Sequence, residues 1–256
     1  MEGLPRTPEK NEYVPLSKQI EQKLGTLEQE RAISVDMQVS PEEQEVIDRI
    51  LIERSLEQFD FYGSNPDELK AKLEIYFAEM GENSSEDLAT ISNIIGRVSE
   101  ATQVGLKGES TWTMVRVSLP NNDFEIPRWH PDGKYYHSIS KQYKLVATVK
   151  GAQTRFANAI NQKEVTKLQQ QESENYDKNA SNPELFNTED IRIRTELAEA
   201  VREKEIGIQG QAVIYLVGED HAVLHSEPHI TESRIFFAVL PGSNEEISQW
   251  EANMRG

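Results

Sequence analysis

The sequence predicts an α+β fold, in which a helical N-terminal part precedes a run of β-strands. Two observations support this class. Apolar residues recur with helical spacing through residues 40 to 107. From about residue 108 onward they instead form short alternating runs, separated by turns rich in Gly, Pro and Asn. The length of 256 residues allows one large domain or two small ones.

Residues 1 to 39 are expected to form a flexible N-terminal tail. Pro5, Pro8 and Pro15 lie there among charged and polar residues, and apolar residues are scattered. Such a segment buries too little apolar surface to offset the entropy lost on ordering.

Residues 40 to 107 are expected to form a helical region that packs on the core. Ser40 is followed by proline and two glutamates, which predicts a capped helix start, and this helix is expected to run to about Phe59. Asn65 and Ser84 mark two further starts, and Gly81 is expected to end the second helix.

Residues 108 to 242 are expected to form the core. Residues 112–119 and 124–130 are predicted to be two strands joined by a turn, and residues 143–150 a third strand. On that third strand, Lys144, Val146 and Thr148 share one mixed face, suited to a wet pocket, and the alternate residues form an apolar face. The later strands are predicted at residues 212–217, 221–225 and 234–240.

A polar insertion interrupts the core at about residues 161–204. A helix is predicted within it, from Thr188 to Val201, and the insertion is expected to be either a solvated excursion or a lid over a site. Residues 243–256 are expected to form a C-terminal tail or a short amphipathic helix.

Composition excludes several classes of function. The formal charge of −17 argues against nucleic acid or an anionic membrane surface as the main partner. The lack of cysteine excludes disulfides, thiolate metal sites and a cysteine nucleophile. No apolar run is long enough to span a bilayer and no signal peptide is recognisable, so we expect a cytoplasmic protein, of undetermined oligomeric state.

His130 and Asp132 form the motif around which the chemistry is organised. They lie two residues apart where a predicted strand ends in a Pro-Gly turn, so both side chains can reach one cation. A pair of this kind leaves room for a third protein ligand, expected to be a distant histidine, and for substrate.

With His225 and Arg234, nine residues further on, this pair resembles the His-x-Asp…His…Arg pattern of the iron(II)- and 2-oxoglutarate-dependent dioxygenases. The resemblance covers roughly residues 110 to 242 and implies a double-stranded β-helix, or jelly-roll, core. It also implies an iron(II) ion bound by His130, Asp132 and His225, with 2-oxoglutarate and dioxygen as co-substrates of an unidentified substrate.

The resemblance further implies that Arg234 holds the far carboxylate of 2-oxoglutarate. A guanidinium suits this role because its fork binds a carboxylate through two hydrogen bonds. Lys144 and Thr148, on the mixed face of the neighbouring strand, are expected to assist it.

Alternatives remain open at this stage. His221 is a rival third ligand, since it lies four residues from His225 and faces the same way on a continuous strand. Two alternative functions also fit the sequence. One is a metal-binding jelly roll without turnover that acts as an interaction module, and the other is a cupin-like enzyme that does not use 2-oxoglutarate.

Overall fold

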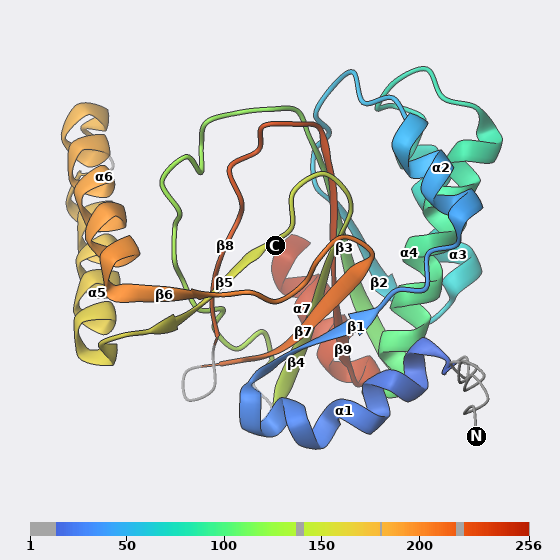
Figure 1. Cartoon of the computed structure of the whole chain (residues 1–256), viewed down its shortest axis with the longest axis horizontal. Coiled ribbons are helices and arrows are strands. Elements are labelled where there is room, and N and C mark those ends of the chain that lie inside the picture. The colour runs from blue at the N-terminus through green and yellow to red at the C-terminus, as the bar shows by residue number, and fades with distance from the viewer. Residues whose placement is uncertain (1–13, 137–140, 180, 219–222, 256) are drawn as a thin grey trace, which may run out of the picture.

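The computed structural model describes residues 14–136, 141–179, 181–218 and 223–255. Mixed helices and antiparallel sheets form successive layers in the order helices, large sheet, small sheet and helical hairpin (Figure 1). The α+β class predicted from the sequence is therefore confirmed. No helix in the described ranges is both long and apolar enough to cross a membrane.

The large sheet has six strands in the order β1-β7-β4-β9-β3-β2, and every neighbouring pair is antiparallel. Its strands are β1 (Ala32–Asp36), β2 (Phe59–Gly63), β3 (Ser110–Ser118), β4 (Gln142–Lys150), β7 (Gln211–Val217) and β9 (Arg234–Gly242). The small sheet has the order β6-β5-β8 and consists of β5 (Arg155–Ala159), β6 (Val201–Lys204) and β8 (Leu224–Ser226).

The alternation of apolar and polar residues predicted for β4 determines which side of the large sheet faces the apolar core and which faces a cavity. Leu145, Ala147 and Val149 belong to the apolar core between the large sheet and the N-terminal helices. Lys144 and Val146 face the opposite side and line a cavity between the two sheets. The period of two along the strand thus positions one wall of the candidate site.

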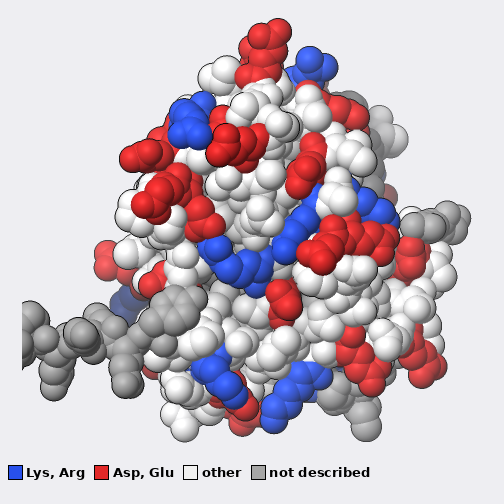
Figure 2. All heavy atoms as spheres, turned by 90° about the vertical axis from the view of Figure 1, so that its right-hand side faces the viewer, with Lys and Arg blue, Asp and Glu red and all other residues white. Residues whose placement is uncertain are grey.

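Four helices cover the outer face of the large sheet, on the right and bottom of Figure 1. They are α1 (Leu16–Glu30), α2 (Pro41–Arg49), α3 (Pro66–Phe77) and α4 (Ser85–Gly105). The predicted starts are present, since Ser40 forms a capping box with Glu43 and the side chains of Asn65 and Ser84 cap the next two helices. On this face a short band of basic side chains runs between acidic ones (Figure 2).

The expectation of a flexible tail over residues 1–39 is wrong for the part that the structure describes. Helix α1 buries Leu16, Ile20 and Leu27, and β1 pairs with β7 at the edge of the large sheet. Helix α1 lies so close to α4 that a Cβ on Gly105 would come within 2.8 Å of Ile20 Cβ. The sparse apolar residues are spaced to form one stripe, which the composition of the segment concealed.

Replacing Leu27 with alanine therefore tests this correction. Leu27 is 0% exposed, so its truncation is expected to lower the free energy of unfolding by about 2 kcal/mol or more, through lost burial and the cavity left behind. Urea denaturation of Leu27→Ala, with the exposed Gln22→Ala as control, measures the effect. Equal midpoints for wild type and Leu27→Ala would restore the flexible-tail interpretation.

The first predicted helix ends earlier than expected, at Arg49 instead of near Phe59. Ile50 is extended, and the backbone of Leu51 exchanges hydrogen bonds with the Asn83 side chain at 2.8 and 2.9 Å. The N–H of Leu56 then donates to Val117 O of β3. Partners distant in sequence thus draw this segment out of the helix, and β2 follows it.

The strand expected at residues 124–130 is absent, because both edges of β3 are already occupied by β2 and β9. The chain instead runs beside the segment before β9, with isolated bridges from Asn121 to Ile230 and from His130 to His225. His130 therefore owes its position to contacts with the small sheet. Of the strand expected over residues 221–225, residues 221 and 222 lie outside the described part, and β8 begins at Leu224, one residue after the described Val223.

The insertion is a helical hairpin of α5 (Gln162–Asn179) and α6 (Pro183–Ala200), where one helix from Thr188 to Val201 was expected. Its inner face packs on the small sheet through Val165, Leu168, Ile193 and Leu197, at the left of Figure 1. The polar composition reflects the other, solvated face of each helix. At the C-terminus, α7 (Asn244–Arg255) packs Ile247 against the inner side of the large sheet.

Candidate metal centre

His130 and His225 are held together by their own backbones. The N–H of each donates to the carbonyl of the other at 3.0 Å, which forms an isolated antiparallel bridge. The two imidazole rings consequently lie side by side, with centroids 4.4 Å apart. His225 is supplied by β8 of the small sheet, and His130 by the irregular segment that runs antiparallel beside it.

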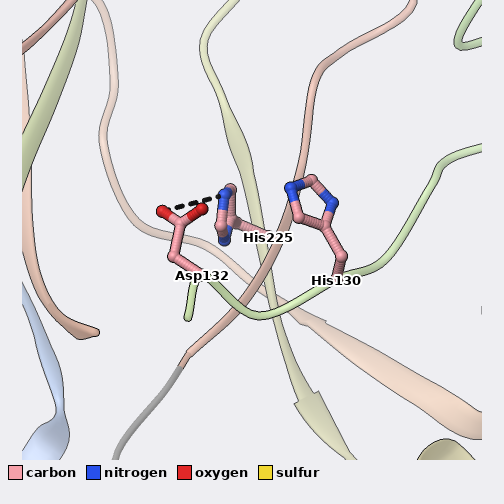
Figure 3. A group of neighbouring side chains, drawn as sticks. All are labelled: His130, Asp132 and His225. Atoms are coloured by element: carbon pink, nitrogen blue, oxygen red, sulfur yellow. Dashed lines mark ion pairs between the residues drawn. The ribbon is translucent and has the colours of Figure 1, made fainter. Parts of the chain in front are cut away.

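Asp132 is brought to the same point by the end of β7. Its carbonyl accepts a hydrogen bond from the N–H of Gly218 at 3.0 Å. Its carboxylate oxygen Oδ2 lies 3.5 Å from His225 Nε2. One potential ligand atom from each of His130, Asp132 and His225 lies within 4.8 Å of the other two (Figure 3).

The hydrogen bonds of the two histidines leave the ring nitrogens Nε2 available for a metal. Nδ1 of His130 lies 2.8 Å from Arg128 O, and Nδ1 of His225 lies 3.2 Å from Val223 O. A carbonyl can only accept, so each Nδ1 carries the proton and each Nε2 keeps its lone pair. Orientation by a backbone carbonyl is the usual arrangement for a metal-binding imidazole.

His225 is also kept in the neutral form that metal binding requires. Burial lowers its pKa to about 4, and the neighbouring Asp132 offsets only part of that effect. Two neutral imidazoles and a carboxylate on one side of a cation suit iron(II) and leave adjacent coordination positions open. The residues present therefore fit a mononuclear iron site.

The carboxylate of Asp132 is anchored through its oxygen Oδ2. Oδ2 accepts hydrogen bonds from Lys144 Nζ at 2.8 Å and from the Tyr215 hydroxyl at 2.7 Å. Burial alone would raise the pKa of Asp132, but the charge of Lys144 and these hydrogen bonds outweigh it and hold that pKa well below its usual range. The carboxylate is ionised, and Oδ2 is also the oxygen that lies 3.5 Å from His225 Nε2.

Lys144 thus lies elsewhere than the sequence suggested. It was expected beside Arg234, yet its Nζ contacts Asp132 and the hydroxyl of Tyr135, the latter at 2.9 Å. Tyr215 is the direct partner of Lys144 in the pairing of β4 with β7. An aromatic residue inside an apolar strand gives no sequence signal of such a contact, and only the register reveals it.

Arg234 is buried, and its hydrogen-bond partners among the described residues are all neutral. Its side chain donates to Ala152 O at 2.9 Å and to the hydroxyls of Thr154 and Thr148 at 3.2 and 3.5 Å. The residue is 3% exposed, and within the described ranges no carboxylate forms an ion pair with it. Burial lowers the pKa of Arg234 to about 10, which leaves the guanidinium charged near neutral pH.

A cavity of about 160 Å³ lies between the two sheets and joins these groups. Arg234 adjoins it, since its guanidinium contacts the lining residue Thr154 and lies 4.6 Å from the ring of Phe236, another lining residue. The remaining lining residues are His130, Asp132, His225, Lys144, Tyr135, Tyr215, Met114, Arg116, Val146 and Glu227. The hairpin α5–α6 contributes none of the lining residues, so its helices do not form a wall of this cavity.

Two larger hollows lie away from the triad. One of about 460 Å³ separates Arg128 from the hairpin, and one of about 530 Å³ lies beside β5 and β6. The first contains the ion pairs Arg128–Glu172 and Arg194–Asp190. Both are more open to solvent than the cavity of the triad. The largest hollow is therefore not the one that contains the candidate metal ligands.

The rival ligand His221 lies outside the described residues, so the structure does not place it. His229 lies in the segment before β9 and pairs with Asn122 Oδ1 at 3.3 Å. Sequence reasoning missed Tyr215, Arg116 and Glu227 as members of the site. The alternation along β3 could have indicated Arg116, since it shares a face with Met114.

Lys144→Met is expected to destabilise the metal-free protein by about 2 kcal/mol, because it leaves the Asp132 carboxylate with Tyr215 as its remaining donor. A divalent cation replaces the lost positive charge, so it should raise the melting temperature more in the variant than in wild type. Thermal unfolding with and without anaerobic iron(II) measures both effects, with the exposed Lys163→Met as control. An unchanged metal-free melting temperature would contradict the proposed role of the ion pair.

No protein-family model matches the chain, and no curated protein matches its sequence. Among solved structures, the chain is similar to a prolyl-4-hydroxylase of Pseudomonas putida at 12% identity and a TM-score of 0.37, over 89% of this chain and 100% of that one. It is also similar to a dioxygenase for auxin oxidation in rice at 9% identity and a TM-score of 0.38, over 82% and 73%. At such low identity and TM-score, neither likeness carries a functional conclusion.

Proposed function

We propose that this chain is an iron(II)- and 2-oxoglutarate-dependent oxygenase that hydroxylates a substrate. The observation that supports this proposal is the coincidence, at one cavity, of a two-histidine, one-carboxylate triad with a buried arginine that pairs with no carboxylate among the residues that the structure describes. In the proposed reaction, 2-oxoglutarate, dioxygen and a C–H group give succinate, carbon dioxide and an alcohol. One oxygen atom enters succinate and the other enters the alcohol.

The triad would hold the metal on one side and leave its other side to small molecules. His130 and His225 present Nε2 and Asp132 presents its carboxylate, while hydrogen bonds at Nδ1 of each imidazole and at Oδ2 of the carboxylate hold the three side chains in place. An iron(II) ion bound there would supply the chemistry that activates dioxygen and decarboxylates the 2-oxo acid. Burial raises the pKa of the Tyr215 hydroxyl well above its usual value. The hydroxyl therefore stays protonated and remains a donor to Asp132.

Arg234 would bind the far carboxylate of 2-oxoglutarate. Leaving a buried guanidinium without a counter-charge is costly, and a dianionic co-substrate would remove that cost. Thr148 and Thr154 contact Arg234 Nη2 and keep the guanidinium at the floor of the cavity. Thr148 therefore assists the arginine as a positioning residue, whereas Lys144 serves the triad.

The two facing antiparallel sheets would be the two halves of a double-stranded β-helix. The large sheet provides the outer wall with β4, β9 and β3, and the small sheet provides β8 with His225. Residues 108–242 would then form the catalytic core, with the hairpin inserted between β5 and β6.

The proposed function is tested by measuring succinate from 2-oxoglutarate with anaerobically loaded iron(II) after admission of air. Slow formation of succinate is expected even without substrate, and it should require both the metal and dioxygen. Protein that binds iron and 2-oxoglutarate but forms no succinate under any of these conditions would contradict the proposal.

The ion pair of Lys144 with Asp132 favours a second candidate, a metal-binding jelly roll without turnover that acts as an interaction module. A lysine 2.8 Å from a ligand carboxylate competes with a cation for its charge. This candidate predicts metal binding without decarboxylation. The same succinate measurement distinguishes the two functions.

A further inference from the structure

Arg116 and Glu227 line the cavity but have no role in the triad or beside Arg234. Arg116 projects from β3 of the large sheet, and Glu227 follows β8 of the small sheet. Their side chains are 45% and 27% exposed, so they lie where the cavity meets solvent. Each sheet thus contributes one charge to the mouth of the cavity.

Arg116 is held from its outer side. Its Nε donates to Gln58 Oε1 at 2.9 Å, and Gln58 Nε2 donates to both carboxylate oxygens of Asp60 at 3.0 Å. Asp60 in turn accepts a hydrogen bond from Trp112 Nε1 at 2.7 Å. This chain of hydrogen bonds orients the guanidinium and leaves its terminal nitrogens for the mouth.

The contact between Arg116 and Glu227 is loose. Nη1 lies 3.5 Å from Glu227 Oε1, beyond the roughly 2.7–2.9 Å of a charge-assisted hydrogen bond. Exposed pairs of this kind contribute little to stability, so a ligand can separate them at low cost. In the described part of the chain, Arg116 Nη2 has no hydrogen-bond partner.

The charges around the cavity differ from those of the chain as a whole. Lys144, Arg116 and Arg234 bring three positive charges to it, against the two carboxylates of Asp132 and Glu227. Anions that the net charge of −17 repels are therefore attracted locally.

We infer that Arg116 and Glu227 form the substrate subsite, and that the substrate is a small zwitterion of the amino-acid type. Its carboxylate would bind the fork of Arg116 and its ammonium group would bind Glu227, so that two close contacts replace one loose pair. The cavity of about 160 Å³ would also hold 2-oxoglutarate, so the zwitterion would lie at its mouth, where Arg116 and Glu227 meet solvent. The inference rests on the proposed function, since the triad beside Glu227 would then face a C–H group of the bound zwitterion.

The first test uses the twenty common L-amino acids as probes in two measurements. One is stimulation of succinate formation by the iron(II) protein with 2-oxoglutarate. The other is the melting temperature of the zinc(II) protein with 2-oxoglutarate, which reports binding without turnover. At least one amino acid should act in both, and its N-acetyl and amide derivatives should act in neither.

Variants then locate the subsite. Arg116→Gln and Glu227→Gln are each expected to raise the half-saturating concentration of the active amino acid at least about tenfold, and Arg116→Lys should recover part of the loss. Arg202→Gln, which changes an exposed arginine of β6, is the matched control. Intact folding of each variant is checked by its melting temperature without amino acid.

Three results would overturn the inference. They are a lack of response to all twenty amino acids, equal activity of the blocked derivatives, and an unchanged half-saturating concentration in both glutamine variants. Failure of the proposed function looks different. In that case amino acids would still raise the melting temperature of wild type, while no succinate forms under any condition.

Discussion

Arg234→Ala is expected to lose most of its affinity for 2-oxoglutarate while it keeps its metal. The guanidinium is buried against the cavity, and its partners in the described part of the chain are neutral, so a carboxylate bound there would make a bidentate, largely desolvated contact. Loss of such a contact costs on the order of 2 to 5 kcal/mol, or about thirtyfold or more in affinity. Isothermal titration with 2-oxoglutarate, under anaerobic conditions and with iron occupancy checked, measures it.

Two further variants separate charge from shape. Arg234→Lys should recover only part of the affinity, because an ammonium group cannot reproduce the fork. Arg234→Met fills the space without charge and should resemble alanine in 2-oxoglutarate affinity. The exposed Arg202→Ala serves as the matched control. If Arg234→Ala kept both normal 2-oxoglutarate affinity and normal succinate formation, the arginine would be structural and the proposed function would lose its main support.

Local signals in the sequence predicted the parts of the fold that depend on nearby residues. The capping box at Ser40 and the caps at Asn65 and Ser84 are satisfied within a single turn, so the helix starts could be identified. The alternation along β4 likewise fixed which face of that strand lines the cavity. These features depend little on the rest of the chain.

Other parts could not be predicted because distant partners determine them. Residues 124–130 have the composition of a strand, but β2 and β9 occupy both edges of β3, so His130 pairs with His225 instead. The ordering of α1 depends on its contact with Gly105 of α4. The place of Lys144 depends on its register with Tyr215, which a single sequence does not reveal.

The proximity of His130, Asp132 and His225 could be anticipated from the sequence, yet the reason for it could not. Spacing suggested a cation shared by His130 and Asp132, and the family resemblance added His225. The structure shows a reciprocal backbone bridge between the histidines and a carboxylate anchored by Lys144 and Tyr215. On each histidine, the ring nitrogen left free is the one that does not contact a backbone carbonyl. The outer hydrogen bonds are thus as much a part of the candidate metal site as the three ligands are.

Loss of metal binding is the largest effect expected at this site. His130→Ala, Asp132→Ala and His225→Ala should each lower iron(II) affinity by more than about a hundredfold, since loss of an outer hydrogen-bond partner alone typically costs tenfold to a hundredfold. Anaerobic isothermal titration measures the affinity. His229→Ala is the matched control, because that histidine pairs with Asn122 and does not line the cavity.

The His225 variant also decides between the two candidate third ligands. Nε2 of His225 lies 3.5 Å from Asp132 Oδ2, and the bridge to His130 fixes its ring in place, so its removal should leave two ligands that cannot retain the ion. His221→Ala should then bind iron(II) like wild type. Wild-type affinity in His130→Ala or Asp132→Ala would refute the site, whereas retention in His225→Ala with loss in His221→Ala would transfer the third position to His221.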